Sequence, residues 1–99
     1  MRMMLKVSVP AAPGNRAIKD GTLPSVVEKA LAELKPEAAY FTVQNGLRTG
    51  LIFIDVQDMS AMPAICEPFF MAFDAAIEMT PVMTADDLRT GLQAALQKM

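Results

Sequence analysis

Residues 38–56 read AAYFTVQNGLRTGLIFIDV, and this stretch decides the fold. On both sides of Asn45-Gly46, apolar side chains occupy every second position, as expected when successive side chains leave opposite faces of a strand. Asn-Gly is the strongest short signal for a hairpin because both residues accept the positive φ angles of a type I′ turn. The stretch therefore predicts two antiparallel strands joined by a tight turn.

The register of this hairpin decides which side chains share a face. If Gln44 pairs with Leu47, odd positions on the first strand lie with even positions on the second. A longer turn over residues 47–50 that keeps the same parity is an alternative. In either case one face of the hairpin carries the β-branched and aromatic side chains Phe41, Val43, Ile52 and Ile54.

The segment before the hairpin predicts a strand and helices. Residues 1–9 alternate and form the first strand, after which Pro10, Pro13 and Gly14 predict a turn. Asn15 is then a candidate cap for a short helical segment. A firm amphipathic helix is expected from about Pro24 to Lys35.

The segment after the hairpin repeats the pattern. Ser60 is a candidate N-cap for a second helix, which Pro68 is expected to kink or split. Residues 75–83 alternate around Pro81 and predict a strand at a sheet edge or beside a bulge. Thr84 precedes two aspartates and caps a terminal helix with an apolar stripe.

The resulting order is βαββαβ with a C-terminal helix. It is the order of the ferredoxin-like α+β fold, in which helices cover one face of a four-stranded antiparallel sheet. We expect one such domain over residues 1–99, with the strands in the spatial order 4-1-3-2.

The two faces of this sheet differ in character. The face assigned to the helices is aliphatic and aromatic throughout: Val7, Val9, Phe41, Val43, Ile52, Ile54, Val56, Ile77 and Met79. The open face mixes apolar side chains with charges and hydroxyls: Met4, Lys6, Ser8, Tyr40, Thr42, Gln44, Leu51, Phe53, Asp55, Glu78, Thr80 and Val82. We expect a homodimer through this open face; the alternative is a monomer with a partly apolar exposed sheet.

Composition excludes several classes of function. The 99 residues contain no histidine and one cysteine, which removes histidine-based catalysis, disulfides and the common metal clusters, so no metal or cofactor is expected. A net charge of −2 argues against nucleic acid as a partner. No apolar run is long enough to span a membrane, and residues 1–9 lack the apolar region of a signal peptide, so a cytoplasmic protein is expected.

Residues 73–88, FDAAIEMTPVMTADDL, carry a family resemblance. This segment resembles the last strand and final helix start in bacterial members, of unknown function, of the dimeric α+β barrel superfamily. The resemblance implies ferredoxin-like subunits that pair sheet against sheet. Relatives in the superfamily include cofactor-free monooxygenases, muconolactone isomerases and stress-induced proteins.

Five polar residues are candidate ligand-binding residues. Lys6, Asp55 and Glu78 share the open face, where they could hold an anion or a proton; an interfacial ion-pair pattern is the alternative. Tyr40 and Arg48 flank the Asn45 turn and could present donors to a ligand, whereas cross-strand packing and solvation would also account for them. No catalytic residue can be assigned.

The sequence supports two functional hypotheses. The first is a homodimeric module that binds a small molecule or serves a structural role. The second is a cofactor-free monooxygenase or isomerase that acts on a small apolar molecule in a pocket beneath the second helix, with a carboxylate or Tyr40 handling a proton. Whether the protein is an enzyme is left open.

Overall fold

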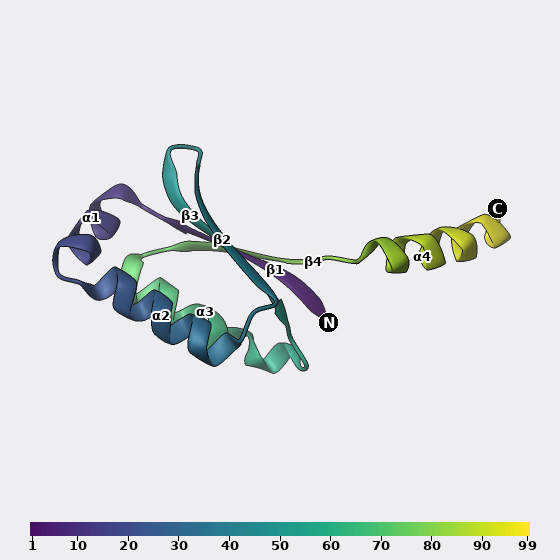
Figure 1. The fold of residues 1–99 in the computed structure, drawn as a ribbon, viewed down its shortest axis with the longest axis horizontal. Helices are drawn as coiled ribbons and strands as arrows, with labels where there is room; N and C mark the ends of the chain where they lie inside the picture. Colours follow the sequence, from purple (N-terminus) through teal and green to yellow (C-terminus); the bar gives the residue numbers. More distant parts are fainter.

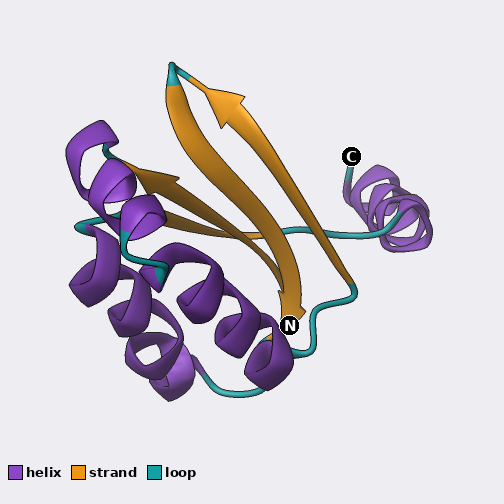
Figure 2. Cartoon of the chain, turned by 60° about the vertical axis from the view of Figure 1, so that its left-hand side comes forward, coloured by secondary structure: helices purple, strands orange, loops and turns teal.

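The computed structural model describes residues 1–99. One four-stranded antiparallel sheet has the order β2-β3-β1-β4, and three of the helices cover one of its faces while the last helix stands apart (Figures 1 and 2). The elements are β1 (Arg2–Val9), α1 (Ala11–Lys19), α2 (Thr22–Leu34), β2 (Ala38–Gln44), β3 (Leu47–Asp55), a 3-10 turn (Met59–Ala61), α3 (Met62–Phe73), β4 (Ala76–Pro81) and α4 (Ala85–Lys98). The expected ferredoxin-like α+β fold and strand order are confirmed.

The hairpin has the tight turn and register expected from its sequence. Gln44 pairs with Leu47, and Asn45 and Gly46 have φ angles of 54° and 75°. These are the left-handed angles of a type I′ turn. The alternative of a longer turn over residues 47–50 is therefore wrong, since β3 already begins at Leu47.

The core lies between the sheet and α1 and α3. Its members alternate along β1 and continue on β3 and α3, and partly buried side chains of α2 pack against it. The fully buried side chains of Leu5 and Phe73 form its centre. The buried residues are Met3, Leu5, Val7, Val9, Ala17, Ile52, Ile54, Val56, Cys66, Phe69, Phe73 and Ala75.

Two residues that the sequence places on the helix-covered face are exposed, whereas Ile77 and Met79 of the same face are partly buried against the core. Phe41 and Val43 lie on the expected face of the sheet, but their side chains are 58% and 69% exposed. The reason is that the tip of the β2–β3 hairpin extends beyond the helices (Figure 1). Parity therefore assigned the face correctly, whereas alternation alone could not show where the helices end.

The helix boundaries also differ from those expected. A helix, not a turn, follows Pro10, because Pro13 lies in the first turn of α1, where a missing N–H costs no hydrogen bond. Asn15 does not cap it; its side chain instead accepts a hydrogen bond from Arg48. Asp58, not Ser60, caps the segment before α3, and α3 runs through Pro68 without being split.

α4 begins with a complete capping box. Thr84 Oγ1 accepts a hydrogen bond from the Asp87 N–H, and the Asp87 carboxylate accepts one from the Thr84 N–H, each at 3.1 Å. Both orphan donors at the helix start are thereby satisfied. Every residue from 85 to 99 is nevertheless exposed, so the apolar stripe expected in this helix packs against nothing in its own chain.

Candidate functional site

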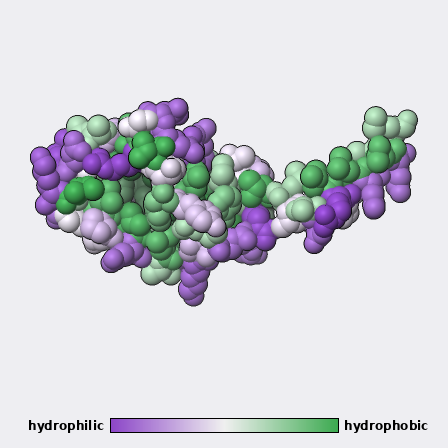
Figure 3. All heavy atoms as spheres, turned by 45° about the horizontal axis from the view of Figure 1, so that its top comes forward, coloured by the Kyte–Doolittle hydropathy of each residue, from purple (hydrophilic) through white to green (hydrophobic).

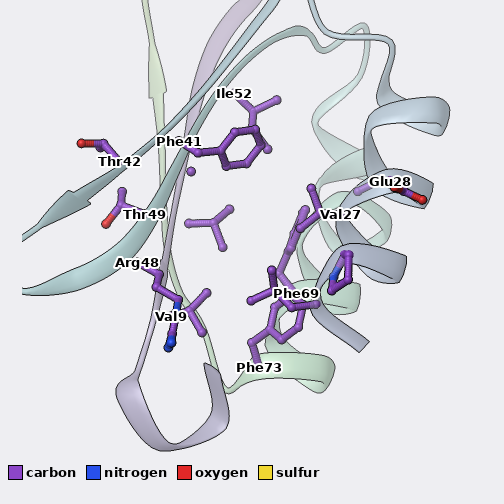
Figure 4. A pocket seen from close by; sticks show the side chains of 15 residues that line it. Val9, Val27, Glu28, Phe41, Thr42, Arg48, Thr49, Ile52, Phe69 and Phe73 are labelled. Carbon is purple, nitrogen blue, oxygen red and sulfur yellow. The ribbon is translucent and has the colours of Figure 1, made fainter. Parts of the chain in front are cut away.

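A cavity of about 450 Å³ lies between α2, α3 and the β2–β3 hairpin. Most of its lining is apolar, and the side chains of Phe41 and Ile52 face those of Val27, Phe69 and Phe73 across it (Figure 4). A site of this size and character suits a small apolar molecule. We therefore take this cavity as the candidate site.

Gly50 lines this cavity and leaves room for the Phe41 ring beside it. It lies in β3 opposite Val7 and Phe41, on the face toward the helices. A Cβ atom at this position would come within 3.2 Å of the Phe41 ring, so the glycine lets that ring lie across the strand. A glycine inside a strand often marks such a close approach. The sequence therefore contained a local signal for a close approach on this face of β3.

Arg48 provides the positive charge at the rim. It lies in β3 opposite Val9, and one Nη atom donates a 3.0 Å hydrogen bond to the side-chain oxygen of Asn15 on α1. Gly14 makes room for the guanidinium, since a Cβ there would meet Nη1 at 2.6 Å. No carboxylate of the chain lies within salt-bridge distance of Arg48, although the side chain is half-buried. A half-buried guanidinium without a counter-charge retains the capacity to bind an anion.

The other polar groups around the cavity are placed differently. Glu28 lies across the cavity from Arg48, on α2, and is exposed (Figure 4). The hydroxyls of Thr42 and Thr49 point away from the cavity (Figure 4). An anionic group is therefore favoured only at the Arg48 end, because the Glu28 carboxylate disfavours one at the other.

The residues expected on the open face are only partly brought together. Lys6 pairs with Glu78 in the β1–β4 ladder, and their charged atoms are 3.4 Å apart. Asp55 lies four positions along β3 from Leu51, the residue opposite Lys6, and binds the N-terminal ammonium at 2.7 Å instead. The expectation that Asp55 joins the Lys6–Glu78 pair is therefore wrong. Asp55 lies at the end of β3, whereas Lys6 and Glu78 meet near the middle of their strands.

Tyr40 and Arg48 do not form one cluster beside the turn. Tyr40 pairs with Leu51 on the open face, whereas Arg48 is on the helix side with Val9. The period of two explains the separation, since an even position on β2 and an even position on β3 lie on opposite faces in this register. Arg48 belongs to β3 and is not part of the turn.

The pocket expected beneath the second helix differs in its walls. The sequence predicts that this pocket is lined by Met62, Phe69, Phe70, Met71 and Phe73. Phe69 and Phe73 do line the cavity, but Met62, Phe70 and Met71 are exposed. Pro68 contacts a separate small hollow between α2 and α3. The wall opposite Phe69 and Phe73 is formed by the hairpin, and Leu23 and Val27 of α2 line the cavity as well. The sequence pattern gave no indication that these residues line the site.

Other reactive groups lie outside the cavity. Burial, together with the negative charge of Glu67, raises the pKa of the Cys66 thiol, which favours its unreactive protonated form. No three carboxylate or thiol groups lie close enough together to hold a metal ion. None of the helices combines the length and apolar character needed to cross a membrane.

The lowered pKa values of Asp55 and Asp58 predict how the stability of the fold depends on pH. The hydrogen bond from the N-terminal ammonium lowers the pKa of Asp55, and hydrogen bonds from Ser60 lower that of Asp58. A lowered pKa in the folded state stabilises the fold above the ordinary value of 3.8, and this stability is lost as the pH falls through the folded value.

We therefore expect the thermal midpoint to drop when the pH is lowered below 3.8. Asp55→Asn removes one of the titrating groups, so the variant should start less stable at neutral pH and lose less on acidification. Calorimetry across this range provides the measurement. An Asp55→Asn variant with the acid sensitivity of the original chain would contradict the assignment.

Comparisons with known proteins bear on the fold and not on the site. No protein-family model matches the chain, and no curated protein matches its sequence. A formyltetrahydrofolate deformylase from Pseudomonas putida KT2440 has a similar structure, with a TM-score of 0.53 and 19% sequence identity over 83% of this chain. The match covers 29% of the deformylase chain. A likeness at this identity supports the fold alone.

Proposed function

We propose that this protein is a small-molecule-binding module whose cavity accepts an apolar molecule with a carboxylate at one end. The observation that carries the proposal is the half-buried Arg48 guanidinium, without a carboxylate partner, at the rim of an apolar cavity of about 450 Å³. The apolar walls would supply affinity, and Arg48 would fix the orientation of the ligand.

Binding is favoured over catalysis by the positions of the proton-handling side chains. Tyr40, Lys6 and Glu78 lie on the open face of the sheet, away from the cavity. The carboxylate that does line the cavity, Glu28, is exposed. A general base for an enclosed apolar substrate would need a group within hydrogen-bond reach of the reacting atoms.

Octanoate and 1-octanol form a matched pair of probes for this proposal, because they share the apolar chain and differ at one end. We expect octanoate to bind the full-length protein more tightly than octanol. Arg48→Met should weaken octanoate binding roughly tenfold to a hundredfold, since a hydrogen bond to a charged group contributes about 1.5–3 kcal/mol. Octanol binding should change little. Titration calorimetry measures both.

Arg16→Met is the matched control. Arg16 is an exposed arginine of α1, so its substitution removes the same charge outside the cavity lining. It should leave octanoate affinity unchanged. Equal losses in the two variants would mean that net charge alone governs binding, and absence of octanoate binding by the original protein would overturn the proposal.

We also propose that two copies of the module pair through the open face of the sheet. Met4, Leu51, Phe53 and Val82 are only half-buried in the single chain, and no helix of the chain covers them. Covering these side chains would remove apolar area from water. A light-scattering mass of twice 10.7 kDa at micromolar concentration supports the homodimer, and a strictly monomeric mass overturns it.

A further inference from the structure

The terminal helix α4 has an apolar side with no partner in its own chain. It projects away from the body of the molecule, and its hydrophobic side chains lie along one side with hydrophilic ones on the other (Figures 1 and 3). Leu88, Leu92 and Leu96 are 48%, 53% and 66% exposed. An isolated helix of 14 residues is marginal in water, so its stability calls for packing of the apolar side.

The spacing of the stripe is that of a helix packed along another element. Ala85, Leu88, Leu92, Ala95 and Met99 follow alternating steps of three and four residues. Such steps keep one narrow seam on one side of the helix. Gln93 and Gln97 lie outside this seam, about 100° and 140° around the helix from Leu92. The helix is thus built to lie against a single apolar surface.

α4 is directed away from its own sheet by a short and well-anchored connection. The Val82 N–H still donates to the Arg2 carbonyl, and the capping box begins at Thr84. Met83 is the one residue between these two anchored positions. The helix therefore continues outward from the end of β4, and reaching its own open face would require a reversal at that single residue.

We propose that α4 of each copy packs on the open sheet face of a second copy, so that two chains exchange their terminal helices. This inference rests on the homodimer proposed above and specifies its contact: α4 of each copy, and not its sheet, lies on the open face of the other. A second copy is the fitting occupant because one chain carries both unpartnered surfaces. A two-fold pair engages both surfaces at once and then closes.

The dimensions agree with this arrangement. The 14 residues of α4 span about 21 Å, and the eight residues of β1 span about 26 Å. Four strands about 4.8 Å apart present a face of roughly 500 Å². Because a helix with its side chains is about 10 Å wide, α4 of the partner fits along this face and covers about half of its width.

The charges also permit self-association. The chain has a net charge of only −2, so two copies repel each other weakly. The open face carries the paired Lys6 and Glu78, and α4 carries the paired Asp86 and Arg89. Neither surface therefore brings an uncompensated cluster of one sign into the interface.

Two double variants of the full chain test the role of the helix. Leu92→Asp with Leu96→Asp places two charges in the apolar side, and Gln93→Asp with Gln97→Asp places the same two charges, equally spaced, on the polar side. We expect the first to be monomeric by light scattering and the second to stay dimeric. A dimeric Leu92→Asp/Leu96→Asp protein would overturn the exchange while leaving the sheet dimer in place; a monomeric original chain would overturn both.

Cross-linking tests where the helix lies. In a Cys66→Ala background, Leu92→Cys chains are mixed with isotopically labelled Phe53→Cys chains and treated with a flexible bis-maleimide. We expect cross-links that join a labelled to an unlabelled chain, detected by mass spectrometry. Cross-links only between two Leu92→Cys chains would place α4 against α4, and either this result or the absence of cross-links would overturn the proposal.

Discussion

Leu5→Ala is expected to destabilise the protein by about 2–5 kcal/mol, the range for truncating a buried leucine. Leu5 is completely buried in the central strand β1, where it pairs with Ile52 on one side and Met79 on the other. Neighbours on two strands and the helices cannot all move inward, so a cavity remains. Against a total stability of about 5–15 kcal/mol, this loss is large.

Val43→Ala is the matched comparison for this measurement. The sequence places Val43 on the same helix-covered face of the sheet, but its side chain is 69% exposed. Its truncation should change stability by no more than about 0.5 kcal/mol. Urea denaturation of both variants measures the difference. Equal losses would mean that the hairpin tip is covered in solution and that the described position of β2 is wrong.

Gly50→Val is expected to reduce octanoate affinity at least tenfold by filling the cavity. The new side chain would occupy the space beneath the Phe41 ring, which a Cβ alone already approaches to 3.2 Å. That ring is 58% exposed and can move outward, so the fold should survive. Valine also suits a strand better than glycine does. Stability should therefore change less than binding.

Gly91→Ala provides the control for this second variant. Gly91 lies in α4, where an added Cβ meets nothing within 4 Å. This variant should leave octanoate affinity unchanged. It should also stabilise α4 by about 1 kcal/mol, because alanine has a higher helix propensity than glycine. Titration calorimetry and circular dichroism measure the two effects. Undiminished octanoate binding by Gly50→Val would show that the molecule binds elsewhere.

Much of the fold could be predicted from local patterns. The Asn45-Gly46 turn fixed the hairpin register because its two residues tolerate positive φ angles that most others resist. Thr84 marked the start of α4 because its side chain satisfies an N–H that has no partner within the helix. The turn and the helix start each depend on a few neighbouring residues, so both can be predicted from the local sequence.

The cavity could not be predicted in the same way. Whether Phe41 is covered depends on how far α2 extends beneath the hairpin, which is set by the packing of distant segments. Alternation shows which face Phe41 occupies and says nothing about what lies opposite. The Gly50 gap gave a local hint of the site, but its other wall comes from Leu23 and Val27 on α2.

The predicted grouping of Lys6, Asp55 and Glu78 was partly wrong for a related reason. Lys6 and Glu78 meet because they are directly paired across β1 and β4. Asp55 shares their face, but a shared face does not set the distance along the strands, and Asp55 pairs with Arg2 at the far end of β1. The N-terminal ammonium that binds Asp55 could not be placed from residue patterns, because it belongs to the chain end and not to a side chain.

Nuclear Overhauser effects from bound octanoate show whether the cavity between α2, α3 and the hairpin binds an apolar carboxylate. We expect contacts from the methylene and methyl protons to the rings of Phe41, Phe69 and Phe73, with the carboxyl end nearest Arg48. Contacts to Met4 and Phe53 on the open face, in place of these three rings, would contradict it.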